Sequence, residues 1–172
     1  MGLGSKAYTI EFNKLQHGLN NDEFKLDRSF MDDFEFSPVK DISVSATIEI
    51  EKSENMYGIK LDLNGWSSVN CDKCLNPIQL PIQQDFSFII KMSEANNFDN
   101  PDMIYLNRNE IGYDLKQYLY ESILLSLPTK IDCDRLPEPK PCDKNVLNKF
   151  NDSHLEDEKL DPRWDKLKDI LK

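Results

Sequence analysis

The sequence predicts an α+β fold, in which an antiparallel β-meander or a partly closed barrel is packed by one main α-helix. Three observations support this. Apolar and polar residues alternate over residues 42–92, the apolar spacing becomes helical after residue 111, and four cysteines follow predicted elements. A Cys/Pro-rich loop and a short C-terminal helix complete the expected fold. We expect a single α+β domain over residues 1–142, a mobile polar linker over 143–159 and a tail helix over 160–172.

Two short elements are expected before the main sheet. A strand pattern runs from Tyr8 to Phe12. Phe30 and Phe34 lie four residues apart, so they can share one side of a short helix. The Ser37-Pro38 pair should end that helix, because the residue before a proline is disfavoured in the α conformation.

The meander is predicted by alternation with a period of two, which gives each strand one buried and one exposed face. The apolar positions of the first two strands are Ile42, Val44, Ala46, Ile48 and Ile50, then Tyr57, Ile59, Leu61 and Leu63. Between them, Glu54-Asn55 predicts the turn of a hairpin. A third pair of runs follows, with Ile78, Leu80 and Ile82, then Phe86, Phe88, Ile90 and Met92. Pro77 and Pro81 should stand at a strand start or a sheet edge, because proline cannot donate to a strand ladder.

The main helix is predicted after the meander. Its apolar positions are Ile111, Leu115, Tyr118, Leu119, Ile123 and Leu127. Pro128 should close it. We expect this helix to cover the apolar face of the meander, because a one-sided sheet must bury that face against another element.

The cysteines carry the most informative chemistry. Cys71 and Cys74 are separated by two residues, and Cys133 and Cys142 follow about sixty residues later. Two such pairs brought together by the fold can hold one Zn²⁺ ion in a tetrahedral site that is structural and not catalytic. The wide spacing of the second pair leaves reduced, unliganded thiols as an alternative, and disulfides as another.

Basic residues near the cysteines are candidates for contact with RNA or with a protein partner. They are Lys73, Lys130, Arg135, Lys140 and Lys144. The first four of these could also offset the negative charge of zinc-bound thiolates. Acidic residues are interleaved with them, so an ordinary solvated surface is the alternative. In the tail, Trp164 begins a narrow apolar stripe on a helix too short to be stable alone, so it should dock on something.

Charge and missing motifs exclude several function classes. The 172 residues include 21 basic and 31 acidic ones, for a net charge of −10, which argues against coating nucleic acid by bulk attraction. Phosphate-binding loops and hydrolase motifs are absent, and His17 and His154 are expected to be solvated, so we expect neither catalysis nor a small-molecule substrate. No apolar run is long enough to span a membrane and no secretory signal is present, so a cytoplasmic protein is expected.

The order of motifs resembles the bacterial YceD family, the large ribosomal RNA subunit accumulation proteins. The resemblance covers about residues 40–172 and rests on three segments. They are Cys71-Asp72-Lys73-Cys74-Leu75, the Glu121-Ser122-Ile123-Leu124-Leu125-Ser126-Leu127-Pro128 helix end and an Asp-Pro-Arg-Trp tail from Asp161. The tail is similar to that of Bacteroidetes-like members.

The resemblance implies a non-enzymatic factor for accumulation or processing of 23S ribosomal RNA and for ribosome assembly. It implies a pre-50S particle, a ribosomal protein or an rRNA-processing enzyme as partner, and a metal site on the four cysteines. An acidic chain suits docking on a basic protein, with RNA contact limited to the local basic strip. The alternative is a zinc-stapled protein-interaction module outside ribosome biogenesis, with the Trp164 helix as its docking segment.

Overall fold

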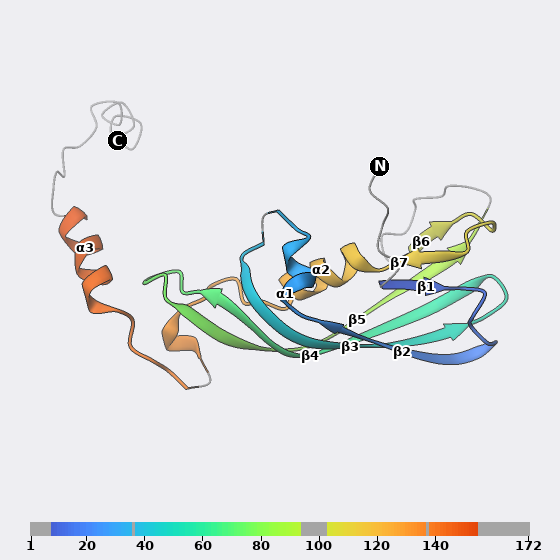
Figure 1. Cartoon of the computed structure of the whole chain (residues 1–172), viewed down its shortest axis with the longest axis horizontal. Helices are drawn as coiled ribbons and strands as arrows, with labels where there is room; N and C mark the ends of the chain where they lie inside the picture. The colour runs from blue at the N-terminus through green and yellow to red at the C-terminus, as the bar shows by residue number, and fades with distance from the viewer. Residues whose placement is uncertain (1–7, 36, 94–102, 137, 155–172) are drawn as a thin grey trace, which may run out of the picture.

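The computed structural model describes residues 8–35, 37–93, 103–136 and 138–154. The expected tail helix over 160–172, with Trp164, lies outside these residues. Figure 1 shows a long curved sheet with shorter elements gathered on one side of it. The fold class is therefore α+β, as predicted.

The main sheet has five strands in the order β2-β3-β4-β5-β6. Their bounds are Gly18–Leu26, Val39–Lys52, Met56–Asn70, Pro77–Met92 and Met103–Leu106. All neighbours pair antiparallel except β5 and β6, which pair in parallel. The predicted meander is confirmed. The alternative of a partly closed barrel is wrong, because in the described part of the chain the sheet is open, with β2 at one edge and β6 at the other.

The alternation pattern predicts the core correctly. On β3 and β4 the expected apolar positions are buried, and the register places Ile48 opposite Leu61 and Ala46 opposite Leu63. Burying one such side chain contributes roughly 1.5–3 kcal/mol. The long hairpin therefore supplies a continuous apolar face.

Four short elements cover that face. Helices α1 (Arg28–Asp32) and α2 (Lys116–Leu125) lie on the concave side of the sheet, with the two-stranded sheet of β1 (Thr9–Glu11) and β7 (Gly112–Asp114) beside them (Figure 1). Ring contacts join these layers. Phe88 on β5 lies 4.3 Å from Tyr118 between ring centroids, and Phe34 stacks on Tyr120 at 3.8 Å. The main helix therefore covers the meander, as expected.

The main helix begins later than its apolar spacing predicts. Ile111 is 78% exposed, and residues Gly112–Asp114 pair with β1 instead. A Cβ atom on Gly112 would lie 2.6 Å from the Ile10 carbonyl oxygen, so glycine permits the close approach of the two strands. Leu115, Leu119 and Ile123 are buried in the core as predicted.

Strand β5 is a single element of 16 residues where two runs were expected. Pro77 is its first residue, and Pro81 lies where β5 pairs with β4 alone, because β6 pairs only with Ile89–Met92. The expected positions of both prolines are confirmed. Strand β2 was not predicted: its sequence is largely polar, and its pairing with β3 gives it order.

Helix α3 (Lys144–His154) forms within the span expected to be a mobile linker. The Asp143 carboxylate accepts a hydrogen bond of 2.8 Å from the Asn145 N–H, which caps the helix start. Val146 is half-buried and packs against the core. Of the helices that the structure describes, none is both long enough and apolar enough to span a bilayer.

Candidate metal centre

The first cysteine pair lies in the tight turn between β4 and β5. The Cys71 N–H donates to the Asn76 carbonyl at 2.9 Å, and the Leu75 N–H donates to the Cys71 carbonyl at 2.9 Å. Leu75 has a φ of 60°, a left-handed conformation that costs a non-glycine residue about 1–2 kcal/mol. This turn brings the sulfurs of Cys71 and Cys74 within 4.8 Å of each other.

The second pair comes from the segment that follows α2. Cys133 begins the short 3₁₀ helix η2 (Cys133–Arg135), and Cys142 lies just before α3. The Lys140 N–H donates to the Cys133 carbonyl at 3.1 Å, so the chain folds back on itself between the two cysteines. This return explains how a pair with a wide sequence spacing can serve one site.

The four sulfurs have the spacing of a tetrahedral metal site. The Cys71 and Cys142 sulfurs lie 3.8 Å apart, the Cys74 and Cys133 sulfurs lie 3.7 Å apart, and all four lie within 4.8 Å of one another. Zinc–sulfur bonds of about 2.3 Å in a tetrahedron place sulfurs roughly 3.8 Å apart. All four cysteines are free thiols, and three are buried. The donor set therefore fits a single Zn²⁺ ion.

The protein shifts the acidity of these thiols in different directions. Burial disfavours the Cys71 thiolate most strongly, yet the N–H groups of Cys74, Lys73 and Cys133 together outweigh it and lower its pKa to about 6. Burial and the neighbouring thiol groups raise the pKa of Cys133. Cys71 is thus prepared to be a metal ligand, and a bound dication would offset the cost of ionising Cys133.

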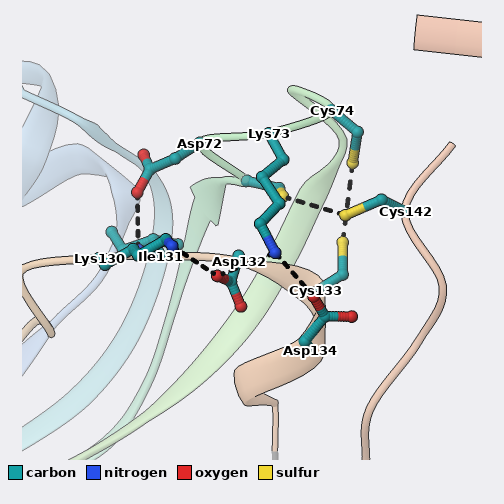
Figure 2. A network of polar contacts seen from close by, with 10 residues as sticks. Asp72, Lys73, Cys74, Lys130, Ile131, Asp132, Cys133, Asp134 and Cys142 are labelled. Carbon is teal, nitrogen blue, oxygen red and sulfur yellow. Dashed lines mark hydrogen bonds and ion pairs between the residues drawn. The ribbon is translucent and has the colours of Figure 1, made fainter. Parts of the chain in front are cut away.

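A network of charged side chains lies beside the sulfurs (Figure 2). The Lys73 ammonium lies 2.7 Å from an Asp134 carboxylate oxygen and 3.3 Å from one of Asp132. Hydrogen bonding to Asp134 first, and then to Asp132, raises the pKa of Lys73. Lys130 also approaches Asp132, at 3.8 Å. The ion pairs of Lys73 link the cysteine turn to the η2 segment.

Asp72 joins the same two segments through the backbone. Its N–H donates to the Ile131 carbonyl at 2.7 Å, and its carboxylate accepts from the Ile131 N–H at 2.6 Å. Asp72, Asp132 and Asp134 were not predicted as positioning residues. Asp72 could have been suspected from its place inside the Cys-x-x-Cys turn, but the sequence holds no signal for its distant partner.

Two further predicted contact residues, Lys140 and Lys144, lie in the same segment as Cys142 but are not part of the sulfur cluster. Lys140 is exposed and lines an open hollow of about 580 Å³ between the start of β5 and the Pro-rich loop. Lys144 is exposed at the start of α3. The Arg135 side chain and Trp164 lie outside what the structure describes. The exposed His17 has no place in the cluster.

Four cysteine ligands would leave no open coordination position for water or substrate. The centre can therefore hold a structural ion that joins the β4–β5 turn to the chain after α2. Such an ion would act as a crosslink between these two segments.

Comparison with known proteins adds one positive finding. The family model described as "Large ribosomal RNA subunit accumulation protein YceD" matches residues 59–171. The chain belongs to the YceD family. The YceD match includes all four cysteines and both segments that hold them. Searches of curated proteins and of solved structures found no significant match.

Proposed function

We propose that this YceD-family protein is a non-enzymatic cytoplasmic factor that supports accumulation or processing of 23S ribosomal RNA during large-subunit assembly. The single observation that carries the proposal is the family match over residues 59–171, which ties the chain to large-subunit RNA accumulation. The cysteine centre is consistent with it, because its four ligands hold a structure together and offer no reactive position.

The direct partner in this proposal is a basic ribosomal protein or a basic surface of an rRNA-processing enzyme on the pre-50S particle. A chain with a net charge of −10 gains from complementary charge on such a partner. RNA contact is limited to the exposed basic residues near the centre. Lys140 and Lys144 are better placed for it than Lys73, whose ammonium is engaged by two carboxylates.

Zinc in this proposal is a structural ion held by Cys71, Cys74, Cys133 and Cys142. The sulfur spacing and the lowered pKa of Cys71 support that assignment. The ion would keep the β4–β5 turn and the chain after α2 together, so the basic residues of both segments would be presented on one surface.

A depletion strain tests the proposed function. We expect lower 23S relative to 16S ribosomal RNA and an accumulation of large-subunit precursors in sucrose gradients, with the tagged protein sedimenting with those precursors. Complementation with the intact gene is the control. Unchanged ribosome profiles on depletion would overturn the proposal.

A further inference from the structure

Away from the cysteine end, where Leu136 and Lys140 border the start of β5, no described helix or strand covers the convex face of the main sheet. Helices α1 and α2 and the β1–β7 sheet all lie on the opposite, concave side (Figure 1). Two adjoining hollows of about 440 and 420 Å³ lie on the convex face, and both are bordered by Glu49, Lys60 and Ser87. Leu19 and Met56 belong to the same face and are 63% and 42% exposed. The convex face is thus a hollowed surface with exposed apolar groups.

Acidic side chains line this face in register. Glu23 on β2 lies opposite Thr47, Thr47 lies opposite Asp62, and Asp62 lies opposite Asp85 on β5. Like charges directly opposite one another on paired strands destabilise the sheet. Glu49 and Glu51 continue the acidic surface along β3. We call these five residues the convex acidic face.

Three exposed lysines on the same side of the sheet, Lys25, Lys60 and Lys91, balance the five carboxylates of the convex acidic face only in part. Of the five carboxylates of this face, only that of Glu49 has an ion pair within the described part of the chain, with Lys60 at 2.9 Å. The row that contains Asp62 and Asp85 has no lysine or arginine in it. The sheet therefore retains a charge repulsion that a cationic partner would relieve.

The spacing of the carboxylates specifies the shape of that partner. Side chains on one face of a strand repeat every two residues, or about 6.6–6.8 Å. On β3, Glu51, Glu49 and Thr47 are spaced by this distance, and Asp62 on β4 lies opposite Thr47. Gly58 and Ser87 border the hollow without long side chains, which leaves room for a main chain above them. An extended segment with a basic residue at every second position matches this spacing.

We propose that the convex acidic face binds an extended Lys/Arg-rich protein segment, with basic side chains at alternate positions directed at Asp62, Asp85 and Glu49. RNA is disfavoured on this face, because its phosphates would be repelled by the carboxylates. The identification of the segment as part of a ribosomal protein or processing enzyme rests on the proposed function. The binding surface itself does not.

A direct binding measurement tests the surface. The probe is a fluorescein-labelled peptide of about ten residues with alternating lysine and threonine, titrated with the full-length protein at low ionic strength and followed by anisotropy. The Asp62→Asn/Asp85→Asn variant should bind it about three- to tenfold more weakly. The matched control is Glu35→Gln/Glu110→Gln, which removes two exposed charges outside this face and should bind like the wild type.

A second peptide and a second variant test the geometry. A peptide of the same composition with its lysines contiguous should bind more weakly than the alternating one. Gly58→Thr suits a strand, and a Cβ at this position would meet its nearest neighbour at 3.9 Å, so the variant should fold. It should still weaken binding, because the side chain stands in the hollow. Equal affinity for both peptides, or unchanged binding by both variants, would overturn the inference.

Sedimentation separates this inference from the proposed function. If the wild type sediments with large-subunit precursors and the Asp62→Asn/Asp85→Asn variant does not, the convex acidic face is supported as the docking surface. If both sediment equally, the convex acidic face is not the docking surface on the precursors, and the proposed function stands. If the purified protein binds the alternating peptide but never sediments with precursors, the surface stands and the proposed function fails.

Discussion

The middle of the main sheet and the cysteine end of the molecule are held together in different ways. The middle relies on many buried apolar side chains, such as Ile48 and Leu61, each of which contributes a modest share. The cysteine end relies on four sulfurs, the hydrogen bonds between Asp72 and Ile131, and the carboxylates around Lys73. Burial stabilises the first region through many contacts, whereas the second depends on a few specific atoms.

This difference implies that the two regions should lose their structure independently of each other. Loss of one group at the cysteine end should loosen the turn and the η2 segment but leave the hairpin folded. Loss of one core side chain should lower the stability of the entire sheet. The four predictions below test this difference, from the largest expected effect to the smallest.

Removing the metal should have the largest effect. We expect protein purified without chelator to contain zinc, and the Cys71→Ser/Cys74→Ser variant to lack it. Structural zinc can supply on the order of 10 kcal/mol of apparent folding free energy, here concentrated at one end. Hydrogen exchange should accelerate at the Asp72 and Lys140 amides and stay slow in the β3–β4 ladder. Equal zinc content in wild type and variant would contradict the assignment.

Leu61→Ala should destabilise the whole sheet. Leu61 is buried at the centre of β4, and deleting such a side chain costs about 2–5 kcal/mol. Urea unfolding should show the loss, while the folded protein keeps its zinc. The adjacent exposed Asp62→Asn serves as the control and should change the unfolding free energy by less than about 0.5 kcal/mol. A similar change in unfolding free energy in both variants would argue against a sheet that is stabilised by its buried apolar side chains.

Asp132→Asn and Asp134→Asn form a matched pair at the cysteine end. Both carboxylates contact Lys73, but the Asp132 side chain is 4% exposed and that of Asp134 is 63% exposed. Weakening the buried contact should cost about 1–3 kcal/mol, and the exposed one less, although it has the shorter distance. Local hydrogen exchange at the Asp72 amide measures this. The reverse order of effects would show that distance matters more than burial.

Ser67→Ala should have the smallest effect. The Ser67 hydroxyl is buried and has no hydrogen-bond partner among the described residues. Removing an unsatisfied buried hydroxyl should be neutral or should stabilise the sheet by up to about 1 kcal/mol. Thermal unfolding with half-buried Ser68→Ala as the control tests this. A clear loss of stability would mean that the hydroxyl has a structural role.

Much of the fold could be predicted because the strands alternate so regularly. The apolar positions of β3, β4 and most of β5 are the buried ones, and the prolines of β5 stand where proline is tolerated. Strand β2 escaped prediction because polar residues dominate it, and pairing with β3 decided its structure. The helix start was misplaced because Ile111 fits the helical period, whereas Gly112 favours a close strand contact.

The clustering of the four cysteines could be predicted from the sequence, but the contacts that support the cluster could not. The Cys71-x-x-Cys74 spacing is a local signal, and the four sulfurs do lie together. The contacts of Asp72 with Ile131 and of Lys73 with Asp132 join residues about sixty positions apart, and nothing in the spacing specifies them. Helix α3 escaped prediction because its span is mostly polar, with the Asp143 cap as its main local signal.

Strand β5 also fixes a distance. It runs without interruption from the cysteine turn at Pro77 to the pairing with β6 at Met92, about 50 Å along its path. A small molecule is too short to reach both ends at once. Any ligand that contacts both the cysteine turn and the Met92 end of β5 must therefore be a macromolecule.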